Sequence, residues 1–287
     1  MSQEKRHGRV LPDSLPGALQ SEDLLLNAGG LRLSARRLTP PVAPPDTSTG
    51  APPNAPTLVF LHEALGSIGQ WKGFPDALAA ELGLPALIYE RQGHGGSAPL
   101  SLPRGNGYLR HEAVTVLPAV LAAAGIERPL LLGHSDGATI ALMFAAAFPQ
   151  APAACIALAP HVMVEEITLA GIRAADAEPG AAETRKRLAK YHGERTEDLW
   201  RAWADTWLRP GFDGCEMRAD LSRITAPTLV IQGAEDAYGS PAQVEEIAKG
   251  AAGPVETHLL PACGHAPHLE AMDRLTAATC AFVKGRE

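Results

Sequence analysis

The sequence predicts an α/β protein with a doubly wound, mostly parallel sheet of the eight-stranded type and a helical cap insertion. Short apolar runs such as TLVFLH (57–62), RPLLLGH (128–134) and APTLVIQG (226–233) lack polar alternation, which is typical of strands buried on both faces. Longer helix-like segments separate these runs, and strands that alternate with helices form parallel sheets. Between 161 and 220 the strand pattern stops and charged, helical sequence follows, too long for an ordinary connection.

The first part of the chain adds a hairpin and a proline-rich loop to this pattern. Residues 1–22 are polar with scattered prolines, so we expect a flexible N-terminus. LLLNAGGLRLSARRL (24–38) predicts two strands joined by a tight turn. The next stretch, 39–56, holds seven of the 25 prolines. It predicts an extended surface loop rather than a domain boundary, because the hairpin before it is too small to stand alone.

The remaining segments set the expected domain limits. The first part of the core covers 23–160. It includes the predicted strands PALIYE (85–90) and AACIALAP (153–160), with the predicted strand 128–134 between them. The helical cap covers 161–220. The second part of the core, 221–287, contains a predicted strand at 254–261 and a final helix that ends near Phe282.

Composition narrows the class of protein and its partners. The 287 residues carry a formal net charge of -7, so no basic field attracts nucleic acid or an anionic membrane. No apolar run approaches the roughly 18 residues that span a bilayer, and no apolar h-region of a secretory signal follows the charged start. The four cysteines are scattered, which is typical of reduced thiols. We expect a cytoplasmic protein, and the sequence leaves monomer and homodimer open.

A G-x-S-x-G pattern stands at 133–137, where an apolar strand ends and an apolar helix begins. A sharp strand-to-helix turn strains Ser135 and lifts its hydroxyl above the sheet, while glycines on both sides remove Cβ atoms that would clash. Adjacent residues on such a turn point in different directions, so His134 and Asp136 are poorly placed as triad partners. Ser135 is the predicted nucleophile, and His134 has no predicted chemistry.

With this motif the chain resembles the α/β-hydrolase fold superfamily over residues 24–284, and in particular capped serine hydrolases and esterases such as the meta-cleavage-product hydrolases. The resemblance implies a triad in the chain order Ser, acid, His, each on a loop after a strand. It assigns the acid to Asp236, fourth in GAED (233–236), and the base to His265 in the Gly-His pair before the last helix. Glu235 and His268 are the competing acid and base.

The resemblance also implies an oxyanion hole made by two backbone N–H groups. One belongs to Asp136, directly after the nucleophile, and the other to Ala64 in HEALG (62–66). Glu63 departs from the family's usual glycine, and a carboxylate that faced the oxyanion would oppose its charge. Either Glu63 points away and pairs with a cation such as Arg91, or it helps to orient substrate or water.

Candidate pocket residues come from the strand ends and the cap. The stretch 89–97 matches the family's R-x-G-x-G-x-S turn, so Arg91 either defines the turn or binds an acidic substrate group. Trp200, Trp203 and Trp207 share one helical face, which packs the cap onto the body, lines an apolar pocket, or does both. The charged segment 183–195 is a solvated face or a basic rim. His94 is interpreted as a further polar pocket liner. The candidate pocket set is Glu63, Leu65, Arg91, His161, Trp203, Trp207 and Tyr238.

The function implied is a serine hydrolase that cleaves a small to medium carboxylic ester through an acyl-enzyme intermediate. A lactone, thioester or amide, C–C bond hydrolysis of a meta-cleavage product, and acyl transfer to an alcohol would use the same triad. A ligand-binding receptor on a hydrolase scaffold is the alternative from another class. The chemistry needs no cofactor, and no metal site is expected because His265 and His268 lack a neighbouring acidic or thiolate cluster.

Overall fold

The computed structural model describes residues 18–41, 55–177 and 179–286. Most of the expected flexible N-terminus and the proline-rich loop therefore lies outside the described residues. The first strand begins at Gln20, so the limit of 22 predicted for the flexible segment is too late. Residues 20–22 pair with the second strand of the hairpin, and this backbone pairing overrides their polar composition.

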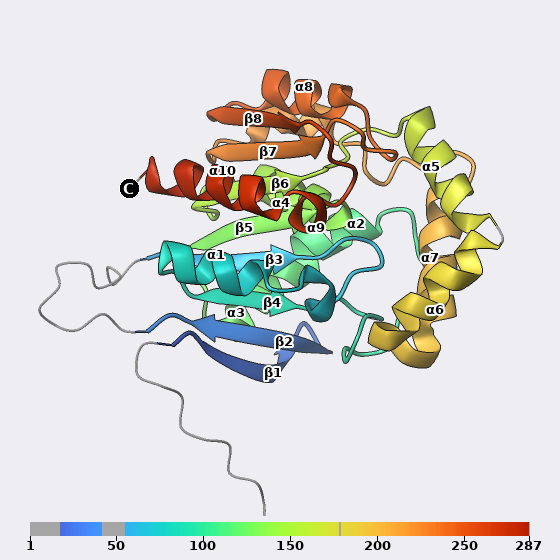
Figure 1. The fold of residues 1–287 in the computed structure, drawn as a ribbon, viewed down its shortest axis with the longest axis horizontal. Helices are drawn as coiled ribbons and strands as arrows, with labels where there is room; N and C mark the ends of the chain where they lie inside the picture. Colours follow the sequence, from blue (N-terminus) through green and yellow to red (C-terminus); the bar gives the residue numbers. More distant parts are fainter. Residues whose placement is uncertain (1–17, 42–54, 178, 287) are drawn as a thin grey trace, which may run out of the picture.

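Eight strands form one mostly parallel sheet in the order β1-β2-β4-β3-β5-β6-β7-β8, which confirms the predicted fold class (Figure 1). β1 and β2 form the antiparallel hairpin, and β2 pairs antiparallel with β4. All other pairs are parallel. The strands are β1 Gln20–Ala28, β2 Leu31–Thr39, β3 Thr57–Leu61, β4 Ala86–Tyr89, β5 Pro129–His134, β6 Ala154–Leu158, β7 Thr228–Gly233 and β8 Val255–Leu260.

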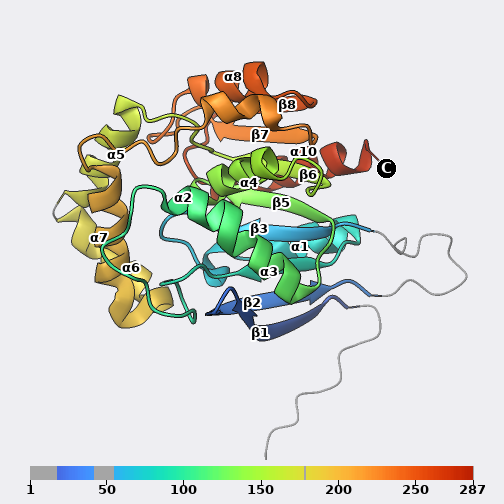
Figure 2. The same ribbon diagram turned by 180° about the vertical axis from the view of Figure 1, so that it is seen from behind.

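Helices cover both faces of this sheet. α1 (Phe74–Leu82) and α10 (Met272–Lys284) lie together on one face (Figure 1). On the other face lie α2 (Tyr108–His111), α3 (Leu117–Ala124), α4 (Asp136–Ala147) and α8 (Pro241–Gly250), as Figure 2 shows. A π-helical turn, Glu112–Val116, joins α2 to α3. Short helices at Ile68–Trp71 and Pro267–Glu270 (α9) follow β3 and β8.

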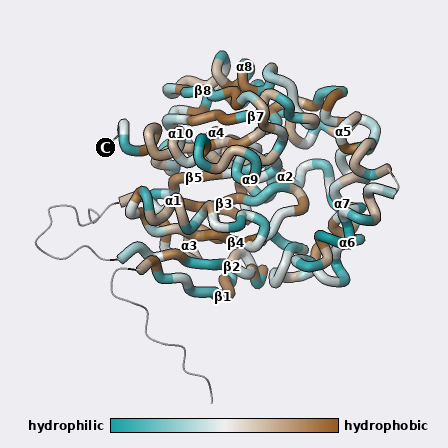
Figure 3. The backbone as a smooth tube through the Cα atoms, in the orientation of Figure 1, coloured by the Kyte–Doolittle hydropathy of each residue, from teal (hydrophilic) through white to brown (hydrophobic). Residues whose placement is uncertain are grey.

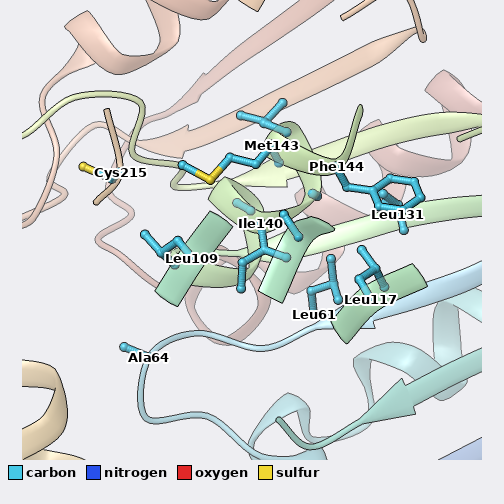
Figure 4. Close-up of a cluster of buried hydrophobic side chains, with 14 of the residues drawn as sticks. Leu61, Ala64, Leu109, Leu117, Leu131, Ile140, Met143, Phe144 and Cys215 are labelled. Atoms are coloured by element: carbon cyan, nitrogen blue, oxygen red, sulfur yellow. The ribbon is translucent and has the colours of Figure 1, made fainter. Parts of the chain in front are cut away.

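The strands β5, β6 and β7 are buried along their whole length and mostly apolar, and Figure 3 shows hydrophobic residues in the middle of the sheet. Leu61 and Leu131 from β3 and β5 pack against Ile140 and Phe144 of α4 in a buried cluster (Figure 4). α4 is therefore an almost completely buried helix. Ala64, on the loop after β3, lies at the edge of the same cluster (Figure 4). The loops that follow the strands therefore begin at buried, well-packed residues.

Three helices between β6 and β7, here called the insertion helices, lie beyond the carboxyl ends of the parallel strands (Figure 1). They are α5 (Glu166–Asp176), α6 (Gly180–His192) and α7 (Thr196–Trp207), with a 3₁₀ turn, Gly193–Arg195, between the last two. The 3₁₀ helix Arg218–Arg223 contacts α4 and α8 instead. Ligands of α/β proteins bind at the carboxyl ends of the strands, so these helices cover the expected site. Their treatment as a separate cap domain stays a prediction.

Candidate active site

Ser135 occupies the sharp turn between β5 and α4. Its backbone has φ 52° and ψ -117°, a conformation that residues other than glycine rarely adopt. A Cβ atom on Gly133 would overlap the Gly137 carbonyl, and one on Gly137 would overlap the Leu61 carbonyl. Close backbone packing therefore requires both glycines, and the turn holds Ser135 at the carboxyl end of the sheet.

Asp236 and His265 meet on the loops after β7 and β8. His265 Nδ1 lies 2.9 and 3.0 Å from the two carboxylate oxygens of Asp236, and the Tyr238 N–H donates to the same carboxylate at 2.8 Å. Burial works to raise the pKa of Asp236, but the hydrogen bond and charge of His265 and the Tyr238 N–H together lower it. Asp236 is thus an ionised acceptor that fixes the orientation of the imidazole.

The structure distinguishes the competing acid and base. Glu235 is exposed, whereas the Asp236 side chain is 1% exposed. The His268 ring packs against Trp71 and His134, with ring centroids 4.9 and 4.8 Å apart. Both histidines line the cavity with Ser135, but among the described residues the Asp236 carboxylate bonds to His265 and not to His268. The structure therefore brings together the three predicted residues, and their catalytic roles stay a prediction.

The loop after β3 lines this cavity with Glu63, Ala64 and Leu65. Glu63 Oε2 accepts the Leu65 N–H at 2.7 Å, and the Glu63 carbonyl accepts the Gly66 N–H at 3.1 Å. Among the described residues, the Ala64 N–H has no hydrogen-bond partner. Asp136 is the first residue of α4, where an N–H has no partner inside the helix. Both predicted oxyanion donors are thus free to bind a ligand.

Three histidine rings form hydrogen bonds with the backbone carbonyl groups of this loop. His62 begins the loop, whereas His94 and His192 come from distant parts of the chain. Because burial lowers the pKa of each ring, all three are neutral at pH 7. The Arg91 N–H donates to His62 Nε2, so the proton of that ring is on Nδ1. The three bonds are His62 Nδ1 to Glu63 O at 2.7 Å, His94 Nε2 to Ala64 O at 2.9 Å and His192 Nε2 to Leu65 O at 2.8 Å.

This arrangement was not predicted. His94 was expected to line the pocket, but its ring is fully buried behind the loop and is not part of the cavity wall. His192 comes from the end of α6 and also accepts the Gly95 N–H at 3.1 Å. One side chain of the insertion helices is therefore bonded to the predicted oxyanion loop.

Arg91 does not line the cavity, and the expectation that it binds an acidic substrate group is wrong. Its side chain is 2% exposed and pairs with Asp136 Oδ2 at 3.5 Å. The Tyr108 hydroxyl donates to the same oxygen at 2.7 Å and accepts the indole N–H of Trp207 at 2.9 Å. A buried carboxylate needs such partners, so Arg91 supports Asp136 beneath the site.

Glu63 does not form the expected ion pair with Arg91. The guanidinium donates instead to the backbone carbonyl of Glu63 at 2.8 Å. The Glu63 side chain lines the cavity together with Ser135 and His265. Burial raises the pKa of this carboxyl group. The alternative in which Glu63 points away from the site is therefore wrong.

The cavity has a volume of about 400 Å³, within the range of small-molecule sites. Leu65, His161, Trp203, Trp207 and Tyr238 line it as predicted. Trp200 does not, because its indole N–H donates to Asp176 of α5 at 2.6 Å. The tryptophan stripe thus both joins the insertion helices and lines the cavity. The wall also contains residues that the sequence did not assign to the pocket: Gln70, Lys72, His134, Thr168, Ile172, Thr184, Arg187, Leu188, Tyr191, Ala266, His268 and Leu269.

His134, for which the sequence predicted no role, contacts the predicted triad directly. Its Nε2 donates to the backbone carbonyl of His265 at 2.7 Å, and burial lowers the pKa of its ring well below 6.5. A neutral His134 therefore holds the loop that carries His265. The only hint of this role in the sequence is that His134 directly precedes Ser135. That position does not predict a contact with His265, which lies 131 residues further along the chain.

In the described parts of the chain, no three His, Cys, Asp or Glu side chains are grouped as metal ligands would be. None of the described helices has the length and apolarity needed to cross a bilayer.

Solved structures of hydrolases share this fold. The 2-hydroxy-6-oxo-6-phenylhexa-2,4-dienoate hydrolase of Rhodococcus sp. strain RHA1 superposes with a TM-score of 0.71 and 15% identity, covering 93% of this chain and 100% of that chain. The enol-lactonase of Burkholderia xenovorans LB400 gives a TM-score of 0.67 and 18% identity, covering 91% of this chain and 100% of that chain. Identities this low show the fold alone.

Sequence comparison identifies a relative and a family. The 2-succinyl-6-hydroxy-2,4-cyclohexadiene-1-carboxylate synthase of Klebsiella pneumoniae subsp. pneumoniae is 28% identical over 167 residues. That match spans 56% of this chain and 56% of the relative, so little more than half of its length is covered. The model of the alpha/beta hydrolase family matches residues 58–278. The resemblance inferred from the motifs is confirmed, and the chain belongs to the alpha/beta hydrolase family.

Proposed function

We propose that the protein is a serine hydrolase that cleaves a small to medium carboxylic ester through an acyl-enzyme intermediate. The observation that carries this proposal is the bond between His265 Nδ1 and Asp236 at 2.9 Å, in the same site as the strained Ser135. An imidazole whose Nδ1 is bonded to a carboxylate leaves Nε2 as the ring nitrogen that faces the reaction. The proposed chemistry uses side chains and backbone groups only.

In the proposed mechanism, His265 Nε2 removes the proton of Ser135 Oγ as that oxygen attacks the ester carbonyl carbon. The N–H groups of Ala64 and Asp136 bind the oxyanion. The C–O bond to the leaving group then breaks, and His265 gives the proton to the departing alcohol. A water molecule, deprotonated by His265, attacks the acyl group and releases the carboxylic acid and free Ser135.

The size and lining of the cavity support the proposed substrate class. About 400 Å³ suits a small ligand. Most of the wall is apolar or aromatic, with Leu188 and Ile172 from the insertion helices opposite the sheet. Where the wall is apolar, it favours an uncharged hydrocarbon or aromatic part of the substrate over a strongly polar one.

Active-site labelling tests the proposal. A fluorophosphonate should label Ser135 in the wild-type protein, and Ser135→Ala should remove both the label and the turnover of p-nitrophenyl esters. If the wild-type protein took no label and cleaved no activated ester, the proposal would be wrong. Ring-fission dienoates and alcohol acceptors, added to the same assay, separate ester hydrolysis from C–C bond hydrolysis and acyl transfer.

A further inference from the structure

The carboxylate of Glu63 is hydrogen-bonded within the turn that contains Ala64, the predicted oxyanion donor. Oε2 accepts the Leu65 N–H at 2.7 Å, so the side chain folds back around Ala64 and stays beside the predicted oxyanion hole. The same side chain lines the cavity with Ser135 and His265. Any substrate whose carbonyl oxygen binds to Ala64 therefore comes close to this carboxylate.

Among the described residues, the only hydrogen bond to this carboxylate is the one that Oε2 accepts from Leu65. The second oxygen, Oε1, is not one of the fully buried unpaired atoms, so it is accessible from the cavity. The nearby cations are engaged elsewhere. Arg187, which lines the cavity, donates to the Thr184 hydroxyl at 3.1 Å. Arg91 pairs with Asp136 and with backbone carbonyls, and Lys72 donates to the Tyr191 hydroxyl at 2.7 Å. Burial raises the pKa of Glu63, while the charges of His265 and Arg91 counteract part of that effect.

An unpaired carboxylate in an apolar site is costly unless a ligand supplies what it lacks. Much of the surrounding wall, including the aliphatic side chains of Leu65, Ile172, Leu188 and Leu269, offers no hydrogen bond to such a group. A plain hydrocarbon acyl chain would leave Oε1 desolvated and unsatisfied. A hydroxyl or ammonium group next to the scissile carbonyl would donate to it directly.

Resting on the proposed ester hydrolysis, we propose that Glu63 is a specificity residue that selects esters with a hydrogen-bond donor, a hydroxyl or an ammonium, on the carbon next to the scissile carbonyl. One carboxylate oxygen fixes the loop and the other binds the donor. The reaction itself is unchanged, because Ser135 attacks the same carbonyl. The carboxylate, unfavourable beside an oxyanion by itself, is neutralised by the donor that the substrate brings.

Three esters of nearly equal shape test this inference at pH 7: benzyl propionate, benzyl lactate and benzyl alaninate, followed by release of benzyl alcohol. The variant Glu63→Gln is matched to the geometry, since its amide oxygen can still accept the Leu65 N–H while an NH₂ group replaces the free acceptor. Comparing variant with wild type on the same ester cancels differences in intrinsic reactivity. Glu127→Gln, an exposed position outside the cavity wall, controls for the charge change.

The inference predicts that Glu63→Gln lowers kcat/KM by about 10–100-fold on the lactate or alaninate ester, with a change of less than about threefold on the propionate ester. A loss on both donor esters identifies the shared donor chemistry, and a loss on the alaninate alone identifies an ammonium ligand. An equal loss on all three esters, or the largest loss on the propionate, would overturn the inference while fluorophosphonate labelling of Ser135 still upheld the proposed function. Absence of both label and turnover would overturn both.

Discussion

His192 at the end of α6 donates its Nε2–H to the Leu65 carbonyl at 2.8 Å and accepts the Gly95 N–H at 3.1 Å. The bond joins the insertion helices to the loop whose Ala64 N–H is the predicted oxyanion donor. Because the pKa of His192 is lowered by burial, the ring is neutral at pH 7 and can both donate and accept. The geometry of the predicted oxyanion hole thus depends in part on His192, which lies 127 positions after Leu65 in the chain.

We predict that His192→Ala lowers kcat by about 10-fold, the effect of losing one hydrogen bond near the transition state, with a smaller change in KM. Steady-state kinetics on a p-nitrophenyl ester measures this split. His192→Gln offers both a donor and an acceptor, so it should recover part of kcat. Wild-type kcat in the alanine variant would show that His192 only packs the insertion helices.

Asp236→Asn tests the predicted orientation of the imidazole. The amide cannot serve as a charged acceptor for the His265 Nδ1–H, and the ring loses its fixed tautomer. We expect kcat to fall by about 10³–10⁴-fold, with unchanged far-UV circular dichroism. Glu235→Gln, which alters an exposed neighbour, should keep wild-type kcat. If the Glu235 variant lost activity instead, the assignment of the acid would be wrong.

The sequence was sufficient where structure depends on local sterics and periodicity. The glycines at 133 and 137 are needed because their Cβ atoms would overlap backbone carbonyls, and this need is visible as a motif. Unalternated apolar runs predicted the parallel strands, because both faces of those strands are covered. The loop order then placed Asp236 and His265 near Ser135.

The contacts that were missed join segments far apart in the chain. His94 contacts the loop after β3 from a turn, and His192 contacts it from α6. No spacing in the sequence predicts these contacts. Arg91 was paired with the wrong carboxylate, because Asp136 is buried by Tyr108 and Trp207 only once α2 and α7 have packed. Buried charges choose partners in the assembled core, so composition alone could not assign them.

Gly137→Ala should strongly destabilise the folded protein. The added methyl group would overlap the Leu61 carbonyl at the crossing of α4 and β3, where both elements are buried and cannot shift. We expect a loss of about 3 kcal/mol or more in the free energy of unfolding, measured by urea denaturation. Gly107→Ala is the matched control, since its Cβ would have no neighbour within 4 Å and its φ of -82° suits alanine. Equal urea midpoints for the two variants would contradict this account.

His268 should make the free energy of unfolding depend on pH. Burial lowers the pKa of this ring from 6.5 to about 4, whereas the unfolded chain takes up the proton near 6.5. Between these values the unfolded state binds more protons, so stability falls as the pH falls from 6.5 toward 4 and the loss levels off below 4. This group alone accounts for a loss of about 3 kcal/mol.

The variant His268→Phe isolates this contribution. Nδ1 of His268 has no hydrogen-bond partner among the described residues, so a phenyl ring forfeits no bond there and retains the contacts with Trp71 and His134. Urea unfolding of the variant should match the wild type near pH 7.5 and exceed it at pH 5, because a phenyl ring takes up no proton in the unfolded chain. Parallel losses in the two proteins between pH 7.5 and pH 5 would show that His268 is not the group responsible, since protonation of the other buried histidines affects both proteins equally.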